Sequence, residues 1–233
     1  MTASTIRRRR PQILWTLLAL LAVGIAGFAV PPYLTGDTSL SKIPLNADVA
    51  LHYLSIVIHA APAGLALIIG PFQFHKRLRA RYPKAHRIAG RVYMVSIVLA
   101  AAAALFAATV SISGFPVQVA FYLLSAAWLY SLYQGYRAIR RGDVQVHRVW
   151  MIRNYALTFA AVSLRLFLAI GLLVQQAVPT LSFNDLYTAS VWASVLVNAV
   201  VAEYFIVHRM LVRRRRSAAL NRPGGNAAAL PAQ

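Results

Sequence analysis

Two short phrases of the sequence carry the residue types most able to do chemistry. Residues 86–93 and 147–155 each open with a histidine and an arginine at the start of an apolar run, and each holds a further arginine and a tyrosine within two turns. Histidine is the side chain that most readily ligates a metal or moves a proton near neutral pH. The matching positions of His86 and His147 therefore predict a paired site.

The position of the two histidines favours a haem site. The positive end of a helix dipole disfavours imidazolium, so a histidine at a helix start stays neutral, which is the form that binds metal. His86 and His147 are therefore candidate ligands of a haem iron. Arg87 and Arg148 are candidates to hold carboxylates or phosphates at the same place. The alternative is that these helix starts bind only lipid phosphates.

A second group of polar side chains lies within the apolar runs. His52 and His59 are seven residues apart and share a helix face, while Asn154 and Arg165 follow His147 on one face of their own helix. A charge deep in a membrane is costly and marks a candidate functional residue. The alternatives are an arginine bound to helix carbonyls and a histidine that only bonds across helices. We predict that His52, His59 and Arg165 form one ligand-binding cluster, and we count Asn154 among the candidates.

The elements that position these residues are predicted to be six membrane-spanning helices. The chain has 233 residues, 59% hydrophobic and 12% charged, with a mean hydropathy of +0.60. Soluble domains carry about 25% charged residues, so this composition indicates a membrane protein. Six runs approach the roughly 20 apolar residues that cross a bilayer. They cover residues 13–30, 50–74, 88–113, 115–136, 149–174 and 186–207.

The predicted fold class is therefore an all-α membrane protein, a bundle of six transmembrane helices. The spans leave no room for a separate soluble domain, so we predict one membrane domain over residues 13–208. A short basic tail, residues 1–12, precedes it. A basic and largely disordered tail, residues 209–233, follows it, because its composition turns to proline, glycine and alanine.

The charges predict how the bundle sits in its membrane. The net charge is +19, and nearly all 24 lysine and arginine residues flank the runs on one side of a six-pass chain. Lysine and arginine favour cytoplasmic loops, so we expect both termini in the cytoplasm and the protein in a bacterial inner membrane. The basic face should attract anionic lipid headgroups, which accounts for the charge without nucleic acid. The chain has no cysteine, which excludes disulfides and thiolate sites.

Several smaller features predict processing and packing. Residues 13–30 follow an arginine run and resemble a signal peptide, but the apolar stretch exceeds the usual h-region, so we expect a retained anchor and leave cleavage open. Glu203 should pair with Arg91 or Arg153, since an unpaired charge at that depth is expensive. Prolines at positions 62 and 71 should kink their helix and free one or two carbonyl groups.

Several motifs follow one another in order between residues 50 and 170. They are Gly70-Pro71-Phe72-Gln73-Phe74, Leu78-Arg79, His86-Arg87, Gly90-Arg91-Val92-Tyr93, the run from His147 to Tyr155, and Leu164-Arg165. In these motifs the chain resembles the bacterial predicted membrane proteins grouped as domain of unknown function 2306. That resemblance implies a multi-pass membrane protein and no established activity.

A weaker likeness is to six-helix, two-haem cytochromes b of the ascorbate-reducible type. These proteins bind haem through histidines on their four central helices. The present chain has histidines on its second, third and fifth spans but none on its fourth. The likeness therefore leaves room for one haem, between His86 and His147.

Three functions remain open from the sequence. The first is a redox membrane protein that binds haem b or quinone among its second to fifth spans. The second is a transporter or binding protein for an anionic or lipidic molecule, which would use His59, Arg165 and the basic face. The third is a structural or accessory membrane protein. A homo-oligomer and an unidentified redox partner both stay open.

Overall fold

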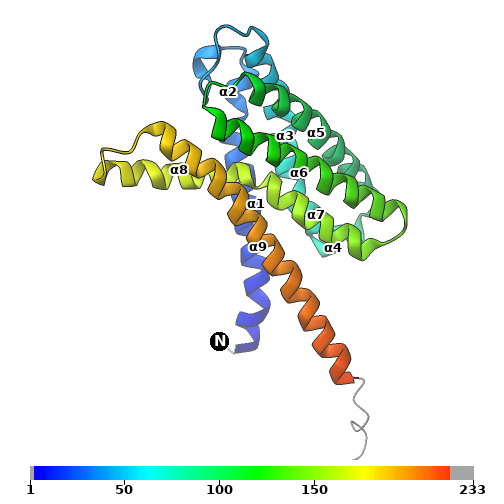
Figure 1. Cartoon of the computed structure of the whole chain (residues 1–233). Coiled ribbons are helices and arrows are strands. Elements are labelled where there is room, and N and C mark those ends of the chain that lie inside the picture. Colours follow the sequence, from blue (N-terminus) through cyan, green and yellow to red (C-terminus); the bar gives the residue numbers. More distant parts are fainter. Residues whose placement is uncertain (1–2, 221–233) are drawn as a thin grey trace, which may run out of the picture.

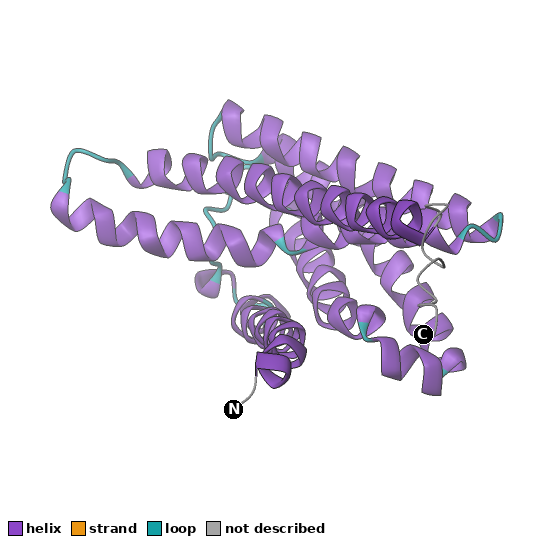
Figure 2. Cartoon of the chain, turned by 90° about the horizontal axis from the view of Figure 1, so that it is seen from below, coloured by secondary structure: helices purple, strands orange, loops and turns teal. Residues whose placement is uncertain are grey.

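The protein folds as an all-helical bundle with six segments long and apolar enough to cross a membrane (Figure 1). This computed structural model describes the backbone of residues 3–220 and the side chains of residues 12–206 and of His208. The described part holds helices and loops and no strand (Figure 2). The predicted fold class is confirmed. Part of the predicted basic face lies outside the described side chains, namely Arg7 to Arg10, Arg209, Arg213 to Arg216 and Arg222.

Ten helical elements build the described chain. The long helices are α1 (Ala3–Ala29), α3 (Leu51–Phe74), α5 (Pro83–Val110), α6 (Phe115–Arg140) and α9 (Phe183–Leu220). The fifth span is divided into α7 (Val144–Thr158) and α8 (Ala160–Ala177). The short elements are α2 (Pro31–Leu34), the 3-10 turn η1 (Thr38–Leu40) and α4 (Lys76–Arg81).

Four helices, α1, α5, α7 and α9, begin earlier than the hydropathy pattern predicted, and the cause is visible for α5 and α7. The third span starts at Pro83 instead of residue 88, because proline fits the first helical turn and needs no hydrogen-bond donor there. The fifth starts at Val144 instead of residue 149, because the Asp143 carboxylate accepts the Val146 N–H at 2.9 Å and caps the helix. A search for apolar runs therefore misses the start of a helix whose first turn is polar.

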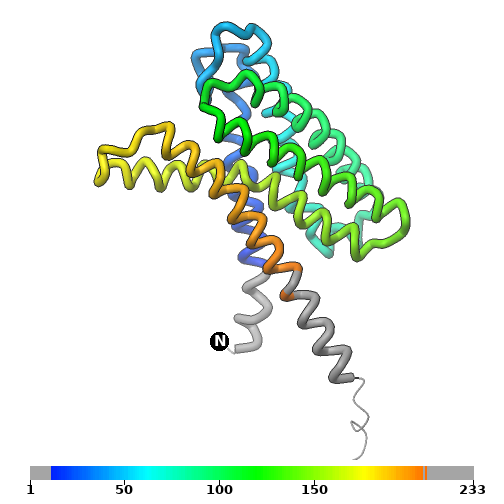
Figure 3. The backbone as a smooth tube through the Cα atoms, viewed as in Figure 1, coloured from blue at the N-terminus to red at the C-terminus, as the bar shows by residue number. Residues whose placement is uncertain are grey.

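The break of the fifth span at Phe159 was not predicted. The Thr158 hydroxyl donates to the Asn154 carbonyl at 3.0 Å, a contact within the helix that tends to bend it. The Val162 N–H then bonds the Phe159 carbonyl, three residues back, at 2.9 Å, which tightens the turn. The tube in Figure 3 changes direction between α7 and α8 and returns along α9, so that α8 and α9 form a hairpin beside the other helices.

Small residues allow the central helices to approach closely. The core holds Ala66 of α3 and Ala100 and Ala101 of α5, each fully buried, and α1 adds Ala22 and Ala26. These residues place α3 between α1 and α5, while α6 packs on α7.

Proline and glycine bring α3 against α7. Pro71 lacks an N–H, so the Leu67 carbonyl loses its partner within the helix, and the Tyr155 hydroxyl donates to that carbonyl at 3.1 Å. The Tyr155 ring lies over Gly70, where a Cβ would overlap it. The predicted freeing of a carbonyl by a proline is confirmed at Pro71. At the next turn, the Trp15 indole of α1 donates to the Pro71 carbonyl at 2.9 Å.

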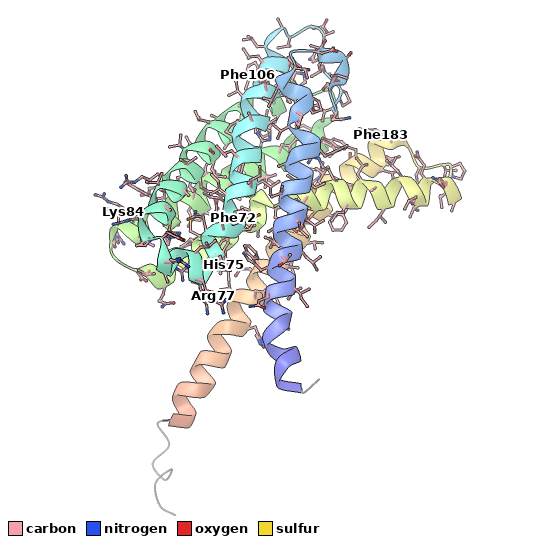
Figure 4. All side chains as sticks on the ribbon, turned by 180° about the vertical axis from the view of Figure 1, so that it is seen from behind. Phe72, His75, Arg77, Lys84, Phe106 and Phe183 are labelled. Atoms are coloured by element: carbon pink, nitrogen blue, oxygen red, sulfur yellow. The ribbon has the colours of Figure 1, made fainter. Side chains whose placement is uncertain are left out.

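The bundle has two distinct ends. The basic end carries the connection around α4 and the turn between α6 and α7. His75, Arg77 and Lys84 lie there in Figure 4, and Phe106 lies at the opposite end. At that opposite end the segment between α1 and α3 folds over the helices, so that Tyr33 is buried against Ile56 and neighbouring side chains. The orientation of these ends in the membrane stays a prediction.

Candidate functional site

The two histidines of the repeated phrase occupy equivalent positions at the basic end. Each is the fourth residue of its helix, His86 in α5 and His147 in α7. Each backbone N–H makes a 3.0 Å hydrogen bond to the carbonyl four residues earlier, which is Tyr82 or Asp143. The two side chains lie within electrostatic range of each other. The two histidines therefore lie within electrostatic range of each other although 61 positions separate them in the sequence, and whether they form one site stays a prediction.

The proton of the His147 ring is placed by a neighbouring helix. Its Nδ1 lies 2.8 Å from the Gly135 carbonyl of α6. A carbonyl only accepts, so Nδ1 carries the proton and Nε2 keeps its lone pair. This carbonyl is near because α6 and α7 touch at Gly135, where a Cβ would lie 2.9 Å from the Met151 sulfur. Metal-ligating histidines are commonly oriented by such a second hydrogen bond.

His86 is the less constrained partner. Its side chain is half-buried and makes no hydrogen bond to another described residue, so both ring nitrogens can serve a ligand. The charge of Arg79 in α4 acts on His86. The His75 ring caps α4 by accepting the Leu78 N–H at 3.3 Å, and it packs edge-on against Trp15. This capped short helix holds Arg79 near His86.

The predicted arginines of this site differ in placement. Arg87 is exposed on α5, whereas Arg148 is half-buried on α7 and makes an interaction with its surroundings. Sequence reasoning assigned no role to Arg79, although its motif was recognised. Its proximity to His86 depends on the turn between α3 and α5, which no spacing in the sequence reveals.

Two turns deeper than the histidines, α5 and α7 are joined by a direct hydrogen bond. Tyr93 and Asn154 follow His86 and His147 by seven residues, about 10 Å along the helix axis. The Tyr93 hydroxyl donates to the Asn154 Oδ1 at 2.7 Å. Residues seven apart share a helix face. The bond therefore shows that the faces of α5 and α7 that carry the histidines are turned toward each other.

Asn154 and Thr158 belong to a buried network that also includes α6. The Asn154 amide nitrogen donates to the Trp128 carbonyl at 2.8 Å and to the Ser131 hydroxyl at 2.9 Å. The Trp128 indole donates to the Thr158 hydroxyl at 2.9 Å, and the Tyr93 hydroxyl lies 2.9 Å from the same oxygen. Both amide hydrogens of Asn154 are used, and the side chain is fully buried. The geometry thus gives this ligand-binding candidate a packing role.

The predicted cluster of His52, His59 and Arg165 is only partly assembled. His52 turns to the overlying loop, where its Nδ1 accepts the Asn46 N–H at 2.8 Å. Its Nε2 is the one enclosed side-chain nitrogen or oxygen without a partner among the described residues. His59 Nδ1 donates to the Ala100 carbonyl at 2.9 Å. No contact joins His52 to Arg165, whereas His59 lies within electrostatic range of Arg165.

Arg165 makes one protein hydrogen bond. Its Nη1 donates to the Ala161 carbonyl of its own helix at 2.7 Å. Its charge also acts on the hydroxyl groups of Tyr33 in α2 and Tyr187 in α9. The structure therefore groups Arg165 with His59 and two tyrosines, which the sequence pattern did not identify as partners.

The predicted partner of Glu203 is Arg153. Arg153 Nε and Nη2 donate to the two Glu203 oxygens at 2.5 and 3.0 Å, a bidentate pair between α7 and α9. The guanidinium also lies over the Trp150 ring, 4.6 Å from its centroid. This prediction is confirmed, and the pair is the one salt bridge among the described residues.

A family model described as predicted membrane protein (DUF2306) matches residues 56–206. The match begins in α3 and ends in α9, so it includes both histidines of the basic end, the buried network, the Arg153–Glu203 pair and Arg165. No curated protein and no solved structure gives a significant match to the chain.

Proposed function

The chain belongs to the DUF2306 family of predicted membrane proteins, and from this premise we propose that it is a membrane redox protein that holds one haem b between His86 and His147. The observation that carries the proposal is that these two imidazoles, at equivalent positions of α5 and α7, lie within electrostatic range of each other. The Tyr93–Asn154 bond supports it, since it turns the two histidine-bearing faces toward each other.

The donor set fits this cofactor. His86 and His147 would hold the iron, because neutral imidazole is a common protein ligand of haem iron. His147 is held as the tautomer with a free Nε2 by the Gly135 carbonyl. His86 has no competing hydrogen bond within the described chain. When bound, the haem would supply one-electron chemistry.

The protein's own residues would position the cofactor and balance its charge. Arg79, Arg87 and Arg148 gather at the same end as the histidines, and guanidinium groups pair well with propionate carboxylates. The buried network between α5, α6 and α7 fixes the helices that carry the two ligands. A rigid frame of this kind would hold the two histidine side chains in a fixed position relative to each other.

The test is optical spectroscopy of protein purified from haem-supplied cells. We expect a Soret band and, after reduction, a b-type α band. His86→Ala and His147→Ala should each abolish both bands. The matched control is His208→Ala, because His208 is exposed and only stacks on Tyr204. His75→Ala should also keep the bands, although it removes the cap of α4.

Folding of each variant is checked by its elution as a single species in detergent. A colourless wild-type protein that also takes up no added haemin contradicts the proposal. Equal haem content in wild type and in both histidine variants contradicts it as well, because the cofactor would then lie elsewhere.

We also propose that the basic end faces the cytoplasm of a bacterial inner membrane. The support is the segregation of lysine and arginine to that end of the chain. Reporter fusions after Arg141 and Arg216 should report the cytoplasm, and a fusion after Asp37 the outer side. A periplasmic signal from the fusion after Arg216 would contradict this orientation.

A further inference from the structure

Arg165 is a cation without an anionic partner among the described residues. All five acidic residues of the chain lie in the described part, and the one salt bridge there joins Glu203 to Arg153. Two of the others, Asp37 and Asp185, accept hydrogen bonds from the neighbouring residues Ser39 and Ser182. A charge within a membrane span is costly unless it is compensated, so the missing partner of Arg165 requires an explanation.

The surroundings of the guanidinium come from three other elements at the end opposite the histidine pair. Tyr33 lies in α2, Tyr187 is the fifth residue of α9, and His59 lies in the half of α3 nearer that end. All three side chains lie within electrostatic range of Arg165. The side chains of this site therefore come from four helices, α2, α3, α8 and α9.

The hydrogen-bonding groups of this site suit an anion. Arginine has five N–H donors, and only one protein bond, to the Ala161 carbonyl, uses them here. The Tyr33 oxygen accepts the Lys42 N–H at 3.1 Å, which leaves its own proton to donate. The ring of Tyr187 is stacked on Phe183 at 6.0 Å, and this stack orients it. At this site the hydrogen-bond donors therefore outnumber the acceptors.

The Arg165 nitrogens that make no hydrogen bond within the described chain are not fully enclosed. None of the Arg165 nitrogens is enclosed without a partner, because His52 Nε2 is the one such atom in the described chain. His59 uses its Nδ1 proton on the Ala100 carbonyl, so its Nε2 can accept a proton from a protonated ligand oxygen.

We propose that Arg165, Tyr33, Tyr187 and His59 bind an anionic oxygen group, a phosphate or a carboxylate, at the end of the bundle opposite the histidine pair. The guanidinium would bind two of its oxygens and compensate the membrane-embedded charge. The tyrosine hydroxyls would donate to the remaining oxygen atoms. The group could belong to a lipid headgroup or to a small anion from solution. This site shares no residue with His86 or His147, so its test is independent of the haem proposal.

The first arm of the test measures a small anion. Thermal unfolding in detergent is followed by tryptophan fluorescence during titration with inorganic phosphate. Wild type should be stabilised, and Arg165→Gln should need at least about tenfold more phosphate for the same shift, as expected when charge-assisted hydrogen bonds are lost. Arg91→Gln is the matched control, since it removes an exposed arginine at the other end and should respond as wild type does.

The second arm measures a lipid headgroup. Native mass spectrometry counts phosphatidylglycerol molecules that stay bound after delipidation, with phosphatidylcholine as the neutral comparison. Wild type and Arg91→Gln should retain one phosphatidylglycerol that Arg165→Gln loses. A response to Arg165→Gln in the first arm alone identifies a small anion, and a response in the second arm alone identifies a headgroup.

Tyr187→Phe keeps the ring on Phe183 and removes only the hydroxyl, so it serves if Arg165→Gln fails to fold. It should weaken the responding ligand about threefold, as expected for one neutral hydrogen bond. The proposal is overturned if neither probe binds wild type, or if both probes bind equally well to wild type, Arg165→Gln and Tyr187→Phe.

Discussion

The two halves of the fifth span, α7 and α8, satisfy their polar side chains in different ways. In α7, Asn154 bonds to α5 and α6, and Arg153 pairs with Glu203 of α9. In α8, the Ser163 hydroxyl donates to Asn198 of α9, but Arg165 bonds only to the carbonyl of Ala161 in its own helix. The first half is hydrogen-bonded to four neighbouring helices, α3, α5, α6 and α9, whereas the second packs mainly on α9 (Figure 1).

This difference separates residues that hold the bundle together from residues that are available to a ligand. A polar group bonded to other helices contributes stability and is costly to remove, because its partners are left unsatisfied within the membrane. A polar group bonded only within its own helix can be removed cheaply. The comparison therefore predicts an order of stability losses, from α7 to α8.

The largest loss is expected for Asn154→Leu. The change leaves the Tyr93 hydroxyl, the Trp128 carbonyl and the Ser131 hydroxyl without their shared partner in a buried site. We expect a loss of about 3 kcal/mol in unfolding free energy, measured as a lower melting temperature in detergent. Thr109→Val is the control, since the exposed Thr109 bonds only to the Phe106 carbonyl. Equal melting temperatures of Asn154→Leu and wild type would show that the network does not stabilise the bundle.

Gly70→Ala should have the next largest effect. The added methyl group overlaps the Tyr155 ring and pushes α7 away from α3, which also breaks the bond to Leu67. Overpacking of this kind costs about 2 kcal/mol. Gly24→Ala is the matched control, because no atom lies within 4 Å of a Cβ there. A stability loss as small as that of the control would show that α3 and α7 are not in close contact at Gly70.

Glu203→Gln should have a smaller effect. The substitution leaves Arg153 charged without its partner, but both side chains are partly exposed, at 29% and 47%, so the loss should be about 1 kcal/mol. The melting temperature of the variant in detergent measures it. If Arg153→Gln and the double variant destabilise no further than Glu203→Gln alone, the two residues act as one pair.

Arg165→Gln should change stability least. Its guanidinium makes no hydrogen bond to another described helix, so we expect a change within about 0.5 kcal/mol. The comparison is made in phosphate-free buffer with a neutral detergent. A loss as large as that of Glu203→Gln would mean that α8 is tied to the bundle through Arg165, and the contrast between the two half-helices would disappear.

The sequence predicted features that depend on local pattern or on charge cost. The six apolar runs correspond to six helices that are long and apolar enough to cross a membrane. The energetic cost of an unpaired carboxylate predicted that Glu203 pairs with an arginine, and its partner is Arg153. Because Pro71 lacks an N–H, the sequence predicted a free carbonyl in this helix, and the Tyr155 hydroxyl donates to the Leu67 carbonyl. Each of these follows from a property of a residue or from one span at a time.

The features that were missed depend on contacts between spans. The break at Phe159 could not be predicted from a proline or glycine, because it follows Thr158. The Thr158 hydroxyl donates to the Asn154 carbonyl and accepts from the Trp128 indole. The polar face of the fifth span suggested one stripe from Asn154 to Arg165, but the break directs its two halves to different neighbours. Tyr33 and Tyr187 lie near Arg165 but belong to other helices. The sequence alone does not show that these helices approach Arg165.

The measurement that tests the central claim most directly is the haem content of the purified protein. Pyridine haemochrome analysis, combined with the protein concentration, gives the number of b-type haems per chain. The paired histidines of α5 and α7 predict one haem per chain in wild type and none in the His86→Ala/His147→Ala double variant. No haem in wild type after growth with a haem supply and incubation with haemin, or one haem retained in the double variant, would contradict the account.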